Sequence, residues 1–344
     1  MKKLITILFL VFGFSSIGYA ESSLPKCQGD DYKQWTNCYG EIKFPRNEYK
    51  GEWKDGKFEG KGTLTEAWGA VYTGDFKNNL AHGFGRQEDP KGDWWEGEIE
   101  NDNLNGQVIW QFENGDKYIG TVKNWILHGQ GTLEYKNGGK YVGGFEDDLF
   151  HGQGTMEYAN GSKYVGLWED DIEHGQGIFT WPNGENYKGE YVYGYREGKG
   201  RYEYKSGTVY EGEFKKNKEH GKGILIYAEG DKYEGEFEDA WMHGQGTMEF
   251  ADGSIYVGLW EDGYRHGQGT MDYANGDKYT GLWEDGEKAE EKTTLAKFTT
   301  EEKYYALIIG NNNYQNQEKL SAAVNDATVL ADLLKNKYGY KTKL

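Results

Sequence analysis

The chain repeats itself every 23 residues, and this period constrains its fold more than any other feature. Segments that open with an aromatic residue follow one another without insertion. They begin at Tyr49, Tyr72, Trp95, Tyr118, Tyr141, Tyr164, Tyr187, Tyr210, Tyr233, Tyr256 and Tyr279. A strict period of this length indicates an array of small units that pack on their neighbours. The 344 residues are therefore not expected to surround one large aliphatic core.

Each repeat predicts two strands and two turns. In "YVGLW", which begins at Tyr164, the tyrosine, glycine and tryptophan alternate with the aliphatic residues and so share one face. Later in six of the repeats comes a turn dipeptide, "NG" or "DG", which favours a tight β-hairpin. These dipeptides begin at Asn114, Asn137, Asn160, Asn183, Asp252 and Asn275. Neighbouring hairpins are expected to pair side by side.

The segments "YKGEWKDGKFEGKG" from Tyr49 and "YEGEFEDAWMHGQG" from Tyr233 resemble the MORN repeat. The resemblance implies a mainly β fold over residues 49–286, an elongated, single-layer, twisted antiparallel sheet of hairpins. About 21 strands at roughly 4.8 Å each predict a length on the order of 100 Å. The stretches at Lys91–Trp94 and Asn105–Val108 depart most from the motif, so the sheet is expected to be irregular there. The candidate aromatics of the repeat face are Tyr141, Tyr164, Trp168, Tyr233, Tyr256 and Trp260.

All seven histidines occupy one position of the repeat, ten residues after the opening aromatic. Histidines one repeat apart would lie about 10 Å from each other, too far to share a zinc ion whose ligands each approach to about 2 Å. We therefore expect no metal site and no cofactor. The favoured interpretation is structural, with the imidazole packed on an aromatic ring and hydrogen-bonded to a turn. A pH-sensitive surface is the alternative.

Residues 1–20 have two lysines, an apolar run and small residues near Ala20, as a secretory signal peptide does. An uncleaved anchor is the alternative, although the run is shorter than the roughly 20 residues that span a bilayer. Export to the periplasm or the extracellular space would favour a disulfide between Cys27 and Cys38. Two free thiols remain possible. Residues 21–48 are thus expected to form a cap, with a partial repeat at Gly40–Pro45.

The period ends near residue 286, and a charged linker is expected over 287–302. Residues 303–344 then predict a buried strand, "YYALIIG", and a helix from Ala322 to Lys335, as in the start of an α/β unit. "ALIIGN" and "VNDA" resemble the N-terminal part of caspase-like cysteine peptidases, especially metacaspases. In that family an aspartate matching Asp326 helps to line an acidic pocket for a basic side chain. An aspartate stabilised by the helix dipole is the alternative for Asp326.

The family's catalytic histidine and cysteine have no counterpart, because no histidine follows His266 and no cysteine follows Cys38. We therefore expect no catalytic residue in this chain, which would carry a truncated caspase-like domain. A longer product is expected to be a caspase-like cysteine endopeptidase.

The net charge of −18 argues against nucleic acid as a partner. The sequence favours an exported scaffold that binds a protein, or a second copy of itself, through the repeat sheet. A free-standing interaction scaffold is one alternative. A module for lipid headgroups or cell-wall glycans is another.

Overall fold

The computed structural model describes residues 22–289, and most of them lie in the strands of one sheet. The signal peptide expected at 1–20, most of the linker, and the α/β unit with Asp326 lie outside these residues. The chain divides into two units, Met1–Glu290 and Glu291–Leu344, and only the first contains described residues. A short 3-10 helix, η1 (Tyr32–Gln34), precedes the sheet.

Twenty-three strands follow. They are β1 (Cys38–Lys43), β2 (Asn47–Lys54), β3 (Lys57–Glu66), β4 (Val71–Lys77), β5 (Leu80–Glu88), β6 (Trp94–Glu100), β7 (Asn103–Gln111), β8 (Lys117–Lys123), β9 (Ile126–Glu134), β10 (Lys140–Glu146), β11 (Leu149–Glu157), β12 (Lys163–Glu169), β13 (Ile172–Thr180), β14 (Asn186–Val192), β15 (Tyr195–Glu203), β16 (Val209–Lys215), β17 (Lys218–Ile226), β18 (Lys232–Glu238), β19 (Trp241–Glu249), β20 (Ile255–Glu261), β21 (Tyr264–Asp272), β22 (Lys278–Glu284) and β23 (Glu287–Lys288).

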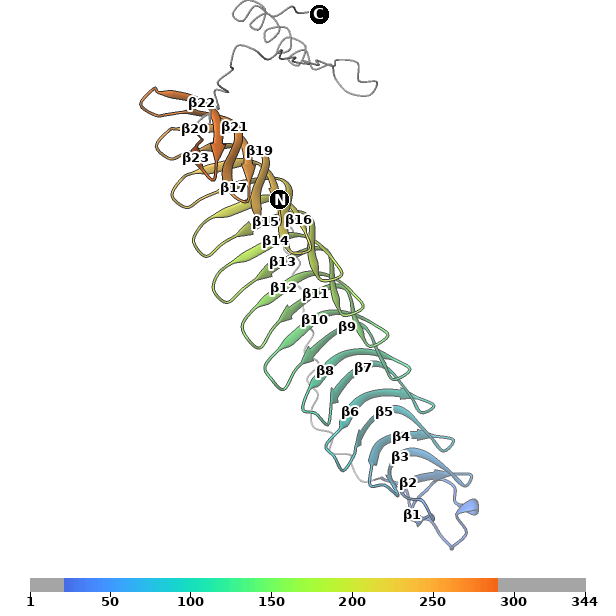
Figure 1. The fold of residues 1–344 in the computed structure, drawn as a ribbon. Helices are drawn as coiled ribbons and strands as arrows, with labels where there is room; N and C mark the ends of the chain where they lie inside the picture. The colour runs from blue at the N-terminus through green and yellow to red at the C-terminus, as the bar shows by residue number, and fades with distance from the viewer. Residues whose placement is uncertain (1–21, 290–344) are drawn as a thin grey trace, which may run out of the picture. The chain divides into compact units, whose positions relative to one another are not determined.

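Each strand pairs antiparallel with the next strand of the chain, as in the hairpins β12–β13 and β14–β15 and the pair β13–β14 that joins them. The hairpins therefore succeed one another along the sheet (Figure 1). The predicted single-layer antiparallel sheet of hairpins is confirmed. Strand β23 pairs with β22, so the sheet extends into residues where the sequence predicted the start of the linker.

The tight turns lie at the other end of the hairpins from the one that the sequence indicated. In the repeat that opens at Tyr164, Asp170 and Asp171 alone connect the strands, and both have positive φ, 49° and 67°. This is the pattern of a type I′ turn, which aspartate and asparagine tolerate. Asn183 and Gly184 instead belong to a wider loop, in which the Gly184 N–H donates to the Trp181 carbonyl at 3.0 Å.

The opening tyrosine forms the core of each hairpin. The Tyr164 ring lies over two facing glycines, Gly166 and Gly177. A Cβ on Gly166 would come within 2.6 Å of Tyr164 Cζ and 2.7 Å of Gly177 Cα. The Tyr164 hydroxyl donates to the Leu167 carbonyl at 3.0 Å. The same bond, to the carbonyl three residues on, is made by Tyr49, Tyr72, Tyr118, Tyr141, Tyr187, Tyr210, Tyr233, Tyr256 and Tyr279.

Each hairpin also curls over its aromatic face. Gly166 pairs with Gly177 while Leu167 pairs with His174, which leaves two extra residues in β13. Such a bulge bends the strands. The Tyr158 hydroxyl, beside a wide loop, consequently reaches Glu173 Oε1, beside a tight turn, at 2.9 Å. The bent hairpins are visible in Figure 1, and the curl buries rings that a flat single layer would leave exposed.

The repeat that opens at Trp95 differs from the other repeats in its core packing and not in its strand pairing. Val108 takes the place of a glycine opposite Gly97, and its side chain is only 2% exposed. A Cβ on Gly97 would lie 2.7 Å from Val108 Cγ1. Strands β6, β7 and β8 nevertheless pair continuously. The irregularity expected here is thus a change in the side chain that occupies the space under the ring, and not a break in the strand pairing.

The N-terminal segment covers the first hairpin. Strand β1 pairs with β2, and Trp35 packs edge-on against Trp53 with ring centroids 5.1 Å apart. The Sγ atoms of Cys27 and Cys38 lie 2.10 Å apart. These contacts bury the end of the aromatic core.

Gly166→Val is expected to destabilise the sheet by about 1–3 kcal/mol, because a branched side chain has no space beneath the Tyr164 ring. Glu169→Ala provides the matched control. Its carboxylate forms only an exposed pair with His174 at 3.2 Å, so the loss should stay within about 0.5 kcal/mol. Thermal unfolding followed by circular dichroism measures both variants. Equal shifts in Tm would contradict the proposed ring-on-glycine packing.

Candidate functional site

The sheet face opposite the tyrosines carries a shallow open groove with a volume of about 950 Å³. Its floor is the line of facing glycines, here called the glycine line. Between β14 and β18 this line consists of Gly189, Gly200, Gly212, Gly223 and Gly235. These positions point toward the tyrosine rings, so on the outer face only their backbone lies between the outward side chains on either side.

Two rows of outward side chains border the floor. The loop-side row, nearer the wide loops, is Lys188, Arg201, Glu211, Ile224 and Glu234. The turn-side row, nearer the tight turns, is Glu190, Lys199, Glu213, Lys222 and Glu236. Both rows mix cations and anions, so the groove offers a charge pattern and not a field of one sign.

Most of these charges have an opposite charge beside them on the neighbouring strand, since Lys199 pairs in register with Glu213 and Lys222 with Glu236. Arg201 contacts Glu203, and Glu234 lies 3.1 Å from Lys232. In the part of the chain that the structure describes, Lys199, Glu213, Lys222 and Glu236 take part in no ion pair. Charges displayed in a groove are a common way to set the specificity of an interface.

The outward positions next to the glycine line are uncharged on both sides of the groove. From β8 to β13 they are Ile119, Thr121, Gln130, Thr132, Val142, Gly144, Gln153, Thr155, Val165, Leu167, Gln176 and Ile178. From β19 to β22 they are Gln245, Thr247, Val257, Leu259, Gln268, Thr270, Thr280 and Leu282. Val165 and Ile178 are 40% exposed and Val257 is 50% exposed. Apolar groups are thus displayed in a row along this face.

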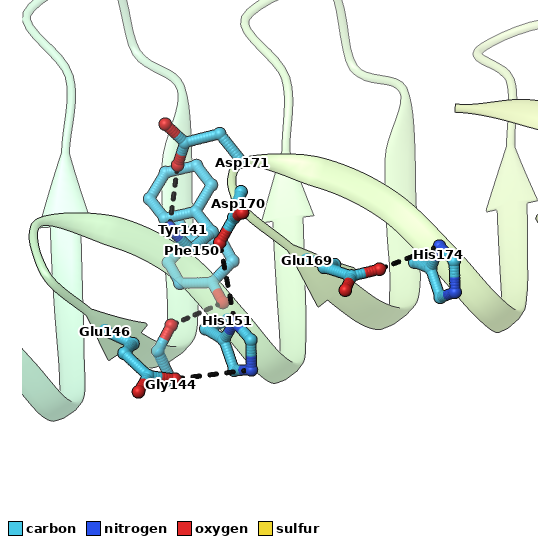
Figure 2. Close-up of polar contacts among 9 residues, drawn as sticks. All are labelled: Tyr141, Gly144, Glu146, Phe150, His151, Glu169, Asp170, Asp171 and His174. Carbon is cyan, nitrogen blue, oxygen red and sulfur yellow. Dashed lines mark hydrogen bonds and ion pairs between the residues drawn. The ribbon is translucent and has the colours of Figure 1, made fainter. Parts of the chain in front are cut away.

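The histidines lie where one hairpin meets the next, as Figure 2 shows for two repeats. His151 Nε2 is 3.4 Å from Glu146 Oε2, and His151 Nδ1 is 3.9 Å from Asp170 Oδ1 of the following turn. His174 approaches Glu169 in the same way, and two further pairs are His243–Glu238 and His266–Glu261. Lysines stand at the glutamate position in the repeats of the other histidines, namely Lys77, Lys123 and Lys215.

The three repeats without histidine show what this position does. Glu59, Asn105 and Glu197 replace it, and their side chains accept the first backbone N–H of the following tight turn at 2.9–3.0 Å. The second turn residue also joins the hairpins, since the Phe150 N–H donates to Asp171 Oδ1 at 2.7 Å (Figure 2). Residues at the histidine position therefore belong to the contact between consecutive hairpins. Over residues 22–289, no group of three or more His, Cys, Asp or Glu side chains is placed to hold a metal ion.

The six candidate aromatics of the repeat face are buried. Tyr141, Tyr164, Tyr233 and Tyr256 are 0% exposed, and Trp168 and Trp260 are at most 5% exposed. They pack on one another, with the Tyr164 and Trp168 centroids 5.0 Å apart and edge-on. Their rings form the core and offer no face to a ligand. The strongly exposed aromatics are Trp68, Tyr193, Tyr195, Trp241 and Tyr264, which lie in turns and at strand ends.

The fold and the groove define a class of protein, a one-layer hairpin array that displays residues on its outer face. The MORN repeat profile matches nine segments, namely 49–71, 72–94, 118–140, 141–163, 164–185, 187–209, 210–232, 233–255 and 256–278. The chain belongs to the MORN-repeat proteins. The caspase domain profile (Peptidase_C14) matches residues 303–344, which lie outside the described residues. No curated protein matches the chain.

Distant similarity to solved structures was also found. The TCP domain of Drosophila melanogaster SAS-4 (dCPAP), in complex with a proline-rich motif of Ana2, is 12% identical over 45% of this chain and 85% of that one, with a TM-score of 0.30. The Danio rerio CPAP TCP10 domain, in complex with a STIL peptide, is 11% identical over 72% and 94%, with a TM-score of 0.24. Similarities this low carry no argument. Among the described residues, none of the helices has the length and apolar character needed to cross a bilayer.

Burial of the tyrosines predicts how the protein responds to alkali. Burial, and then the nearby Glu173 charge, raises the pKa of Tyr164. Burial, followed by the hydrogen bond to Glu185, raises the pKa of Tyr202 to about 12. An unfolded tyrosine ionises near pH 10. The stability contributed by these groups is therefore complete below about pH 10 and is lost as the pH rises above it, since the unfolded chain then releases more protons.

Tyrosinate absorbance is expected to rise in two steps in the native protein. The exposed rings should ionise near pH 10, and the buried rings only as circular dichroism reports loss of the sheet. In guanidinium chloride all 28 tyrosines should titrate together near pH 10. Complete titration near pH 10 with an intact sheet would contradict the buried position of the opening tyrosines.

Proposed function

We propose that this MORN-repeat protein is a binding platform that engages a protein partner through the outer groove, and that the segment at 303–344 belongs to a caspase-family domain attached to the platform. The observation that carries the proposal is the pair of charged rows beside the glycine line. The ring-on-glycine core recurs from repeat to repeat, whereas the outward positions change from uncharged to charged and back. Variation confined to one accessible face is expected of a recognition surface.

The chemistry of the groove favours a protein over the alternatives. Glycans are commonly held on exposed aromatic faces, and the groove has a glycine floor and charged or aliphatic walls. An anionic membrane or a nucleic acid would be repelled by a chain of net charge −18. Side chains of both signs beside apolar positions suit a folded protein surface with the complementary pattern.

Binding, and not peptide hydrolysis, is proposed for the chain as it stands. A cysteine peptidase needs a thiolate beside a histidine, and the caspase-family segment has neither residue. Asp326 is not assigned a role in this proposal. Hydrolysis of lysine-, arginine- or aspartate-type fluorogenic peptides by the purified chain would contradict this part of the proposal.

A photo-crosslinking amino acid at Ile224, inside the groove, is expected to give a discrete protein adduct in the native cell. The same substitution at Ile172, which is 40% exposed at the tight-turn edge, serves as the control and should give none. Adding Lys222→Glu should lower the adduct yield roughly tenfold, as charge reversal at a close pair does. Adducts with lipid or glycan alone, or equal yields from both positions, would contradict the proposal.

We further propose that the protein is exported and that Cys27 and Cys38 form a disulfide. The two Cα atoms lie 4.9 Å apart, within the range of about 4.4–6.8 Å that a disulfide requires. Protein recovered from outside the cytoplasm should begin at Glu21. Its intact mass should be unchanged by alkylation unless it is first reduced. A retained leader, or two alkylated cysteines without reduction, would rule this out.

A further inference from the structure

The last hairpin of the described sheet is incomplete. Strand β20 pairs with β21 along its whole length, but β22 pairs with β23 only at Trp283 and Glu284. On the side of β22 that faces away from β21, Lys278–Gly281 have no strand beside them among residues 22–289. This side is here called the β22 edge, and it lies at the end of the array of hairpins (Figure 1).

The backbone of β22 points hydrogen-bonding groups toward this edge at alternate residues. The Ala289 N–H donates to the Leu282 carbonyl at 2.9 Å, so the backbone groups of Leu282 point away from β21. In an antiparallel strand every second residue points the same way. The N–H and C=O groups of Lys278 and Thr280 therefore point toward the β22 edge. A strand edge that presents such groups is a template for a further strand.

The last opening tyrosine, Tyr279, covers one glycine where the others cover two. In the preceding hairpin the Tyr256 ring covers Gly258 and Gly269, and a Cβ on Gly269 would lie 2.6 Å from Tyr256 Cζ. A Cβ on Gly281 would lie 2.8 Å from Tyr279 Cζ, but at the β22 edge no described residue lies opposite Gly281. Tyr256 is 0% exposed, whereas Tyr279 is only partly buried. The ring therefore adds an apolar surface to the β22 edge.

We propose that the β22 edge binds an extended strand of a partner protein, which pairs antiparallel with Lys278–Gly281 and completes the last hairpin. The site is separate from the outer groove, so the proposal goes beyond the proposed function. Main-chain hydrogen bonds hold the added strand, and the contact with the Tyr279 ring selects its sequence.

The complete hairpins define the chemistry of that strand. In each hairpin that opens with tyrosine, the second strand places a glycine opposite the glycine under the ring. Two residues later it places an apolar or aromatic residue opposite the tyrosine, except that Tyr72 faces Gln87. The partner strand thus needs a glycine opposite Gly281 and, two positions later, an apolar residue opposite Tyr279.

The residues that follow β23 do not have this pattern. Complete repeats that open with tyrosine have glycine 11 and 13 residues after that tyrosine, whereas Glu290 and Lys292 stand at these distances from Tyr279. A side chain at the second position would enter the space beneath the ring, as a Cβ on Gly269 would beneath Tyr256. Neither glycine of residues 290–344 is followed two positions later by an apolar residue. A strand from outside this chain is therefore the better fit.

A second copy of the chain does not present such a strand. Strand β1 has the pattern, but a Cβ on its Gly40 would lie 2.6 Å from Trp35 Cζ3, so the Trp35 ring already covers this glycine. The Tyr39 N–H donates to the Pro25 carbonyl at 2.8 Å, and the Tyr39 carbonyl accepts from the Cys27 N–H at 2.9 Å. The other strands with this pattern lie inside complete hairpins. The expected occupant is thus a strand of a different protein.

A fluorescent peptide with the sequence of residues 264–273, YRHGQGTMDY, serves as the test strand, because β21 completes the preceding hairpin. Fluorescence anisotropy is expected to show saturable binding of this peptide to the full chain. The same peptide with Gly269→Val should bind about tenfold more weakly or worse, because a branched side chain has no space beneath the Tyr279 ring.

Substitutions in the full chain locate the bound peptide. Thr280→Pro removes an N–H at the β22 edge and no hydrogen bond to β21, so it should raise the peptide dissociation constant about tenfold or more. Thr280→Ala keeps this N–H and should change the constant by no more than about twofold. Glu41→Pro, the matched change on the side of β1 that faces away from β2, should leave the constant unchanged. Circular dichroism and the Tm of each variant verify that it folds.

A full chain that does not bind the peptide would overturn the inference, and so would equal affinity for the two peptides. Unchanged affinity in Thr280→Pro, or weaker binding in Glu41→Pro, would contradict the assignment to the β22 edge. Self-association that the peptide reverses, measured by sedimentation velocity, would assign the edge to a second copy and also overturn the inference. These outcomes are independent of the crosslinks from Ile224, which test the proposed function.

Discussion

The contact between each opening tyrosine and two facing glycines underlies the rest of the structure. The ring requires glycine at two facing positions of the paired strands. The hydroxyl donates to the carbonyl three residues further on, as that of Tyr164 does to Leu167. A glycine line therefore crosses the sheet. On one side it holds the aromatic core, and on the other it leaves the floor of a groove. Packing fixes these glycines, whereas the outward rows vary without disturbing the ring.

Contacts between consecutive hairpins make an array of short units into one body. The backbone and side chain of Asp171 both bond Phe150 of the preceding hairpin, and the residue at the histidine position lies beside the next turn. Stability in such an array is a sum of local terms and contacts with neighbours. Histidine thus recurs because the contact between consecutive hairpins recurs. Its periodic spacing needs no catalytic explanation.

The chain matches two family profiles, and the MORN repeats make up most of it. The MORN repeats bury aromatic rings within each hairpin and need only their neighbours. The segment at 303–344 matches a caspase domain profile and lies outside the described residues. The chemistry of that family depends on a histidine and a cysteine that no residue after His266 supplies.

The sequence by itself determined the period, the number of strands and turns in a repeat, and the face on which Tyr164, Gly166 and Trp168 lie, because alternation and glycine spacing are local properties. It misplaced the tight turn, since Asp170 and Asp171 adopt positive φ without the glycine that signals such turns. It also left open whether the repeat-face rings meet a ligand. Only the tertiary structure decided that they are buried and that Lys199, Glu213, Lys222 and Glu236 share a groove. Burial of the rings depends on the curl that a bulge produces in each hairpin. The groove depends on the register between hairpins. Both arise from contacts between residues distant in the sequence.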